Sequence, residues 1–366
     1  MTPSGTREDS HENRPKLRKL PSPILFAKVT TIEEVSVHSA PDRDDTVTSP
    51  VILAADVGGT RSRFLVAPLD PQAPPLMDSP VLGPGANLRS SGPGALQSLA
   101  GPAREALATA GVTGDQVRAA VLGIAGNGAA RRQEISHAVA ETLAPLGITP
   151  DALHATDDHL TAFLSADVGE DGLLLLAGTG SVSVRFEHRR PVQRCDGMGW
   201  LLGDVGSAVW LGRAVLQAVA ADIDGRGPRT RLTESLGDVL GLDLRDGLVP
   251  RSATGDPRQD LVAAIDGLSP AELGRFAPLP GSLCEDAPDE VAREILDHAG
   301  RHFSRTVQRL DPEAGLPVVL AGGVLSTRGP IHDDLVSWLE TAGRTVVPVD
   351  DGLDGAVRLA RERSPR

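Results

Sequence analysis

An aspartate and two glycines stand between two apolar runs of the chain. The run VILAA leads into Asp56, and Gly58, Gly59 and Thr60 follow before the chain becomes apolar again. Glycine lets backbone N–H groups approach phosphate oxygens without a Cβ clash, and a nearby carboxylate can hold Mg²⁺, directly or through water. The stretch predicts a phosphate-binding turn with Asp56 as the magnesium ligand. A plain two-glycine hairpin turn is the alternative.

A second turn of this kind follows the apolar run LLLLA, where Gly178, Thr179, Gly180 and Ser181 occur in succession. Neither turn is a P-loop, because the chain contains no GxxxxGK[ST] sequence. Two matching turns are a stronger signal than one. The pair predicts a nucleotide site built from two separate hairpins.

Two adjacent acids, Asp157 and Asp158, follow the short strand-like segment LHAT. A hydroxyl that attacks a phosphate needs a carboxylate within hydrogen-bond reach to take its proton. One acid of such a pair can instead cap the helix expected over 159–166. We predict Asp157 as the general base and Asp158 as the helix cap.

A glycine-rich loop over 197–207 leads into a helix and carries Asp204. Small residues every few positions suit a loop that wraps a ligand, and a carboxylate in such a loop can accept hydrogen bonds from the hydroxyls of a polyol. A simple connection with core tryptophans at Trp200 and Trp210 is the alternative, but it gives Asp204 no role.

The elements that would position these residues alternate between strand and helix, which is typical of an α/β protein. Each glycine turn ends a strand beside an acid or a hydroxyl, so the chain is expected to form two similar halves. The expected elements are hairpins over 51–69 and 172–186, buried strands over 117–126 and 316–326, and helices over 94–111 (interrupted near Gly101 and Pro102), 159–166, 206–221 and 289–310.

Composition excludes several classes of function. The 366 residues carry a formal net charge of −13, which argues against nucleic acid or an anionic membrane as partner. No apolar run reaches the roughly 20 residues that cross a bilayer, and residues 1–20 lack the apolar part of a secretory signal. Cys195 and Cys284 are the only cysteines, which predicts a reducing, cytoplasmic location. Residues 1–48 are charged and proline-containing, and we expect a disordered tail there.

Four motifs, DVGGTRS, AGTGS, GDVGSAVW and LAGGV, occur in this order. Together they resemble the N-acetylglucosamine kinase-like branch of the BadF/BadG/BcrA/BcrD ATPase family, within the sugar kinase/Hsp70/actin superfamily. The resemblance implies two ribonuclease-H-like (actin-like ATPase) domains with a cleft between them, over 49–157 plus 355–366 and over 158–354. It also implies transfer of phosphate from ATP, with Mg²⁺, to the 6-hydroxyl of an amino sugar, with N-acetylglucosamine as first choice. A homodimer is left open.

The resemblance also implies roles for single residues. It implies that the two glycine turns bind the phosphates of ATP and that Gly322 and Gly323 bind its adenosine. It also implies that Asp157 is the general base. The residues that it implies for sugar binding are Asn87, Asp157, Gly199 and Asp204.

The chain departs from the family pattern around the sugar. Asp196-Gly197-Met198-Gly199 stands where the family often has GGWG, Val205 replaces a glutamate, and Arg89 stands where some relatives have an aromatic residue. These changes make glucosamine or another hexosamine the competing substrate. An ATPase that activates a dehydratase or reductase is a further alternative, which two cysteines disfavour because an iron–sulfur cluster needs several thiolates.

Overall fold

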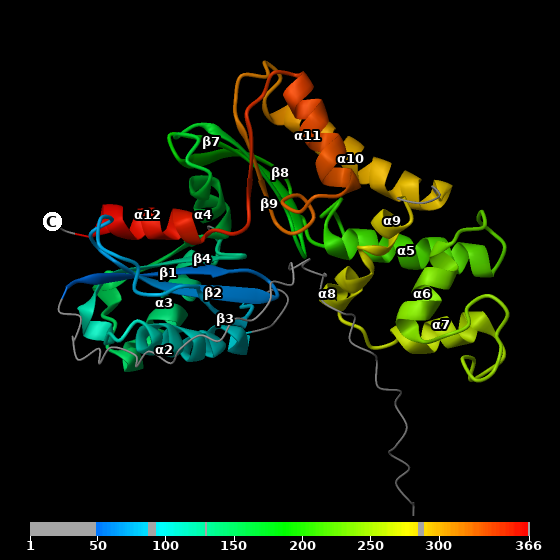
Figure 1. The fold of residues 1–366 in the computed structure, drawn as a ribbon, viewed down its shortest axis with the longest axis horizontal. Coiled ribbons are helices and arrows are strands. Elements are labelled where there is room, and N and C mark those ends of the chain that lie inside the picture. Colours follow the sequence, from blue (N-terminus) through cyan, green and yellow to red (C-terminus); the bar gives the residue numbers. More distant parts are fainter. Residues whose placement is uncertain (1–48, 87–92, 129, 285–288, 365–366) are drawn as a thin grey trace, which may run out of the picture. The chain divides into compact units, whose positions relative to one another are not determined.

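The structure is a computed structural model that describes residues 49–86, 93–128, 130–284 and 289–364 (Figure 1). Of these, residues 219–266 form one compact unit, and the remaining described residues form a second unit that holds both β-sheets. Two predicted features, the tail over 1–48 and the sugar ligand Asn87, lie outside the described residues, as does Arg89. The predicted boundaries of the two actin-like domains stay a prediction.

The first sheet has the strand order β3-β2-β1-β4-β5. Strands β1, β4 and β5 are parallel to one another, whereas β2 is antiparallel to β1 and to β3. The carboxyl ends of β1, β4 and β5 therefore meet at one edge of the sheet, which is where ligands bind in open α/β sheets. The strands are β1 (Val51–Val57), β2 (Arg61–Pro68), β3 (Val81–Pro84), β4 (Val117–Ile124) and β5 (Leu153–Asp157).

The second sheet repeats this plan, with the order β8-β7-β6-β9-β10. Again the first two strands form an antiparallel hairpin, and the later two strands are parallel to the first. The expectation of two similar halves is confirmed. The strands are β6 (Gly172–Ala177), β7 (Ser181–Glu187), β8 (Arg190–Asp196), β9 (Val318–Ala321) and β10 (Val346–Val349).

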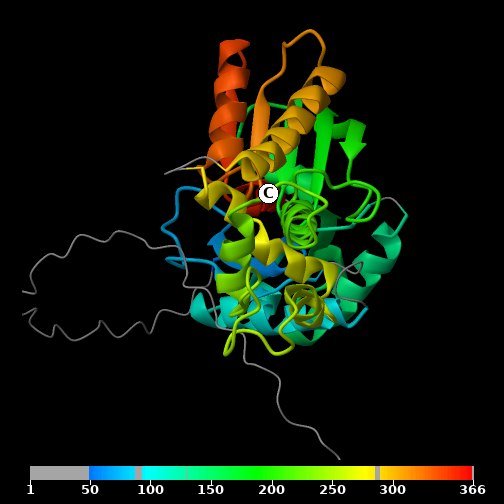
Figure 2. The same cartoon turned by 90° about the vertical axis from the view of Figure 1, so that its right-hand side faces the viewer.

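Alternation along the buried strand β1 explains the layers around the first sheet. Side chains of successive residues point to opposite faces. Val51, Leu53 and Ala55 therefore join the core under α2 and α3, while Ile52 and Ala54 join the core that contains α4, α12 and the second sheet (Figure 1). Helices α10 and α11 lie side by side, and α10 packs on β6, β7 and β8 of the second sheet (Figure 2).

The helices of this unit are α2 (Ala100–Thr109), α3 (Arg132–Leu143), α4 (Asp158–Ser165), α5 (Ala208–Ile223, whose last turn belongs to the smaller unit), α8 (Pro270–Leu273), α9 (Leu279–Ser282), α10 (Glu290–Leu310), α11 (Pro330–Thr341) and α12 (Leu353–Arg363). Short 3₁₀ turns cover Pro93–Leu99, Gly114–Gln116, Ala144–Leu146, Pro150–Ala152 and Gly274–Phe276.

Helix α12 lies against β1, β4 and α4. A Cβ at Gly355 would overlap with the carbonyl oxygen of Thr161, so only glycine permits this approach. The Gly355 N–H also donates to Ser165 Oγ at 2.9 Å. The C-terminal helix is thereby fixed to the first sheet.

The smaller unit contains the end of α5 with α6 (Leu232–Leu240) and α7 (Pro257–Ile265). Its centre is the buried Asp222 carboxylate, which accepts from Thr233 Oγ1 at 2.5 Å and from Arg245 Nη1 at 2.8 Å. A buried charge needs such partners. No predicted site residue lies in this unit.

The helical stretch expected over 94–111 is interrupted close to Gly101 and Pro102, as predicted. A 3₁₀ helix over Pro93–Leu99 ends where α2 begins at Ala100, so Pro102 lies in the first turn of α2, where no intrahelical donor is needed. The edge strands β3 and β8 were not predicted, since β3 contains glycine and proline and β8 is mostly exposed and polar.

Candidate functional site

The first predicted phosphate turn connects β1 and β2. The Gly58 N–H donates to the Arg61 carbonyl at 2.8 Å, and the Gly58 carbonyl accepts from the Ala86 N–H at 3.2 Å. A Cβ at Gly85 would lie 2.5 Å from the Gly59 carbonyl carbon, so residues 85 and 86 pack tightly against the turn. The turn is thus held from behind by the segment after β3.

Asp56 lies just before this turn, at the carboxyl end of β1, and its side chain is 15% exposed. Arg63 bridges this acid and Asp351, which follows β10, at 3.4 Å and 3.2 Å respectively. Burial and the charge of Asp351 raise the pKa of the Asp56 carboxyl to about 6, against the opposing charge of Arg63. The site thus holds more negative charge than Arg63 balances.

The second predicted turn connects β6 and β7. The Gly178 N–H donates to the Gly180 carbonyl at 2.9 Å, and the Gly178 carbonyl accepts from the Ala208 N–H at the start of α5 at 2.8 Å. Gly322 has a φ of +80°, and a Cβ there would lie 2.5 Å from the Ala177 carbonyl oxygen. The structure therefore brings the second turn together with the predicted adenosine motif, whereas Gly323 is exposed and meets no neighbour.

The two adjacent acids have different surroundings. Asp157 is the N-cap of α4, and its Oδ1 accepts from the His159 N–H at 3.2 Å and lies 2.7 Å from His159 Nδ1. Its Oδ2 lies 3.4 Å from Arg194 Nη2, on β8. The prediction that Asp158 caps the helix is therefore wrong, because Asp158 is the first residue inside the helix and cannot reach back over its own turn.

Asp158 is 13% exposed, and its Oδ1 has no hydrogen-bond partner; His159 Nε2 is 3.6 Å away. Burial raises the pKa of Asp158 to about 7, and the charge of Asp157 adds to this effect while His159 opposes it. Burial would also raise the pKa of Asp157, but the hydrogen bonds and charge of His159 lower it to about 2. The pair thus contains one fully engaged carboxylate and one that is available for a proton.

The predicted sugar acid Asp204 is 9% exposed and adopts a left-handed backbone, with φ of +51°. Its Oδ1 accepts from the Gly199 N–H at 3.1 Å, which brings two predicted sugar residues together. A Cβ at Gly180 would lie 3.0 Å from Asp204 Oδ2. The second glycine turn and the predicted sugar acid are therefore direct neighbours.

Four residues near these groups could not be assigned a role from the sequence. Arg194, on β8, contacts Asp157, and Asp351, after β10, contacts Arg63 beside Asp56; a lone arginine or a surface-like DD pair carries no signal for such contacts. In the sequence Asp196 is only a departure from the family pattern, whereas in the structure its carboxylate accepts from the Asp204 N–H at 2.6 Å.

Asn127 is the fourth residue. It follows β4, the strand between β1 and β5, and its N–H donates to the Ile124 carbonyl at 3.1 Å. The side chain is fully buried, yet neither Oδ1 nor Nδ2 has a hydrogen-bond partner. Buried amides in native proteins are almost always paired, and such exceptions cluster at functional sites. The signal in the sequence is the GNG run after a buried strand.

These residues fit a magnesium ion and a nucleotide. Asp56 is a largely buried carboxylate, and burial together with the charge of Asp351 raises its pKa to about 6, so a cation beside it would be stabilised. Carboxylate oxygens of this kind are the ligands that Mg²⁺ prefers. At Gly178 a Cβ would meet no atom within 4 Å, so open space lies before that turn.

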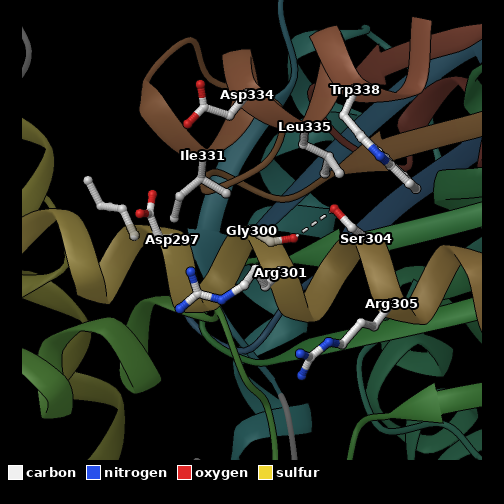
Figure 3. A pocket seen from close by; sticks show the side chains of 10 residues that line it. Asp297, Gly300, Arg301, Ser304, Arg305, Ile331, Asp334, Leu335 and Trp338 are labelled. Atoms are coloured by element: carbon white, nitrogen blue, oxygen red, sulfur yellow. Dashed lines mark hydrogen bonds between the residues drawn. The ribbon is translucent and has the colours of Figure 1, made fainter. Parts of the chain in front are cut away.

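A separate pocket of about 310 Å³ lies between α10 and α11 (Figure 3). Gly300 leaves a gap on α10, and Ile331, Leu335 and Trp338 of α11 form the opposite side (Figure 3). None of the residues that line this pocket is a predicted site residue. The pocket therefore does not define the site described above.

Two sheets of equal strand order, each with a glycine turn after its first strand, define the actin-like ATPase fold. The chain belongs to the BadF/BadG/BcrA/BcrD ATPase family, whose pattern it matches over residues 55–357. The prediction of the family and of the fold class is thereby confirmed.

Individual relatives agree with this membership. An N-acetyl-D-glucosamine kinase from Dictyostelium discoideum is 29% identical over 189 residues, which cover 48% of this chain and 54% of the relative. The match thus spans about half the length of that protein. Glucosamine kinase GspK from Vibrio cholerae is 24% identical over 73% of this chain and 82% of its own.

A solved structure proposed to be an N-acetylglucosamine kinase, from Chromobacterium violaceum, is similar with a TM-score of 0.66 and 25% identity, over 85% of this chain and 99% of that one. Among the described helices, none combines the length and the apolar character that a bilayer crossing requires.

Proposed function

We propose that this protein is an ATP-dependent kinase that phosphorylates the 6-hydroxyl of an amino sugar. The observation that carries the proposal is the contact between the second glycine turn and the Asp204 loop. There, a carboxylate that can accept hydrogen bonds from sugar hydroxyls lies beside a backbone turn whose N–H groups can bind phosphate. A phosphotransferase needs this juxtaposition, because the acceptor must meet the transferred phosphoryl group.

We assign the proton transfer to Asp158 rather than to Asp157. A general base needs a free lone pair and a pKa near the working pH. Asp158 has an unpartnered oxygen and a pKa of about 7, whereas His159 and Arg194 engage both oxygens of Asp157. In this assignment Asp157 positions the start of α4 and thereby orients Asp158.

The other residues bind and orient the reactants. The turns at Gly58–Thr60 and Gly178–Ser181 hold the phosphates, Gly322 and Gly323 face the adenosine, and Asp204 accepts hydroxyls of the sugar. Asn87 and Gly199 complete the proposed sugar contacts, while Asp157, whose two oxygens are engaged by His159 and Arg194, supports the start of α4. Asp56 would hold Mg²⁺, which when bound neutralises charge on the phosphates and so favours attack by the sugar hydroxyl.

N-acetylglucosamine is the proposed substrate, and glucosamine is the second candidate. The first is supported by the relative from Dictyostelium discoideum and by the similar structure at 25% identity. The second is supported by the relative from Vibrio cholerae, whose match covers more of this chain. Met198, at the start of the exposed apolar part of the loop, can cover an acetyl methyl because its side chain is apolar and adaptable.

The test is a coupled ADP-release assay with Mg-ATP and, in parallel, N-acetylglucosamine, glucosamine, N-acetylmuramate and glucose. We expect the highest kcat/KM for N-acetylglucosamine, and a product whose phosphorus couples to the C6 protons in NMR spectra. A preference for glucosamine above about tenfold reverses the ranking of the two substrates. ATP hydrolysis that no sugar stimulates would favour the ATPase-activator alternative and contradict the kinase proposal.

A further inference from the structure

Asp196, at the end of β8, has an unusual backbone for an aspartate. Its φ is +63°, in the left-handed region that favours glycine, and its side chain is only 7% exposed. The resembling family often has glycine at this position. A non-glycine residue with this backbone is strained, although aspartate and asparagine tolerate it better than other residues. The side chain therefore needs compensating contacts.

The backbone N–H groups that contact the Asp196 carboxylate belong to the loop that carries Asp204. Oδ1 accepts from the Asp204 N–H at 2.6 Å, and Oδ2 accepts from the Val205 N–H at 3.0 Å. The Met198 N–H lies 3.5 Å from Oδ1, at the limit of a hydrogen bond. A Cβ at Gly203 would overlap with Asp196 Oδ1, so the backbone of the loop packs directly against the carboxylate at Gly203.

A second element holds Asp196 from the other side. His302, on α10, places Nε2 at 3.2 Å from Asp196 Oδ2. Burial would raise the pKa of the Asp196 carboxyl, but His302 and the loop N–H groups lower it to about 2, so the group stays ionised as an acceptor. The three elements β8, α10 and the loop over 197–207 thus meet at one carboxylate.

These contacts determine where Asp204 points. Asp204 also has a left-handed backbone, and its own Oδ1 accepts from the Gly199 N–H. The loop is thereby closed at both ends, from Asp196 to the backbone of Asp204 and from the side chain of Asp204 to Gly199. Loss of the Asp196 contacts would release the Asp204 backbone from its strained conformation and turn its carboxylate away from Gly180.

We propose that Asp196, oriented by His302, is the positioning residue that sets the Asp204 carboxylate for sugar binding. Asp196 does not touch the sugar in this proposal and acts through Asp204 alone. The inference rests on the proposed kinase function. It adds a chain-specific residue where the resembling family often has glycine.

The experiment compares four test variants and one control variant of the full chain with the wild type. Asp196→Gly removes the carboxylate and suits the backbone, so the variant is expected to fold. Asp196→Asn keeps the oxygen that accepts from the Asp204 N–H and replaces the oxygen that accepts from the Val205 N–H by an NH₂ group. His302→Gln keeps a donor toward Asp196, and His302→Ala removes it. Asp289→Ala is the matched control, because Asp289 is the N-cap of α10, the helix that carries His302, and accepts from the Ala292 N–H at 2.9 Å.

The measurements are KM for N-acetylglucosamine, KM for ATP, kcat and Tm. We expect Asp196→Gly to raise the sugar KM by about tenfold or more, the factor for one charge-assisted hydrogen bond, with the KM for ATP changed less than about twofold. Asp196→Asn and His302→Ala should raise the sugar KM by less than Asp196→Gly does. His302→Gln should have a sugar KM close to that of the wild type. Asp289→Ala should lower Tm and leave both KM values unchanged.

Contrary results for the variants and for the wild type have different meanings. An Asp196→Gly variant with a lower Tm but an unchanged sugar KM would overturn the positioning role, because Asp196 would then only stabilise the fold. An equal rise of both KM values would overturn it too. A wild-type protein that phosphorylates no amino sugar would overturn the proposed function itself. The activity of the wild type is therefore measured before any variant is compared.

Discussion

The guanidinium of Arg194 lies 3.4 Å from the carboxylate of Asp157, and this contact joins the edge strand β8 of the second sheet to the end of β5 in the first. Arg194 Nη2 is also 3.2 Å from His159 Nδ1. Both oxygens of Asp157 are thus engaged. The neighbouring Asp158 is the acid that keeps an unpartnered oxygen.

The first prediction separates the two acids. Asp158→Asn should lower kcat by at least about 100-fold with little change in the KM for ATP, because the amide has no basic lone pair. Asp157→Asn should lower kcat less and should lower Tm, since it weakens the cap of α4 and the contact with Arg194. Steady-state kinetics and thermal unfolding measure both effects. The reverse order of the two kcat losses would return the base to Asp157.

The second prediction concerns pH. The pKa of Asp158 in the folded protein is raised to about 7, so the folded protein retains a proton that the unfolded chain has already lost between about pH 4 and 7. The contribution of Asp158 to stability therefore falls as the pH rises through this window, while activity rises because the base must be ionised. We expect kcat/KM to increase from pH 6 to pH 8 with an apparent pKa near 7. Asp158→Asn should be more stable than the wild type at pH 8 and show no such rise in its residual activity.

The third prediction concerns the second phosphate turn. Gly178→Ala adds a Cβ that would meet no protein atom within 4 Å, so Tm should stay unchanged. A phosphate that approaches the turn would meet this Cβ, and calorimetry should show a Kd for Mg-ATP raised by about tenfold or more. Gly101→Ala is the matched control, because its Cβ also meets open space and Gly101 lies in α2, outside the turns and loops of the candidate site. Unchanged ATP affinity in Gly178→Ala would mean that this hairpin is only a turn.

The fourth prediction concerns Asn127. Asn127→Leu keeps the branched shape and removes two buried polar atoms that lack partners, so the free energy of unfolding should rise by about 1 kcal/mol. If the amide contacts the sugar when the site is occupied, the same variant should show a higher KM for N-acetylglucosamine. Denaturant unfolding and kinetics on one preparation measure both changes. A less stable variant with normal kinetics would show that Asn127 has a structural role instead.

The sequence predicted the parts of this fold that depend on local pattern. Apolar runs that end in glycine identified both hairpins, and helical spacing identified α10 nearly to the residue. It could not predict β3 and β8, because edge strands need only one partner and carry weak apolar patterns.

The site was predictable in its turns and not in its acid–base details. Glycine turns follow from local sequence, but the division of roles between Asp157 and Asp158 depends on Arg194, which reaches Asp157 from another sheet. Asp196 and His302 likewise meet through tertiary packing of β8 against α10. No spacing rule connects residues so far apart along the chain.

The attachment of α12 to the first sheet has a consequence for biosynthesis. Residues 51–157 supply every strand of that sheet, yet Ala356 and Ala360 of α12 are part of its core. During synthesis on the ribosome, one face of the first sheet therefore stays partly exposed until residues 353–363 have been made. During this interval α4 covers only part of that face, so a nascent chain stalled before residue 353 would be a ready target for chaperones.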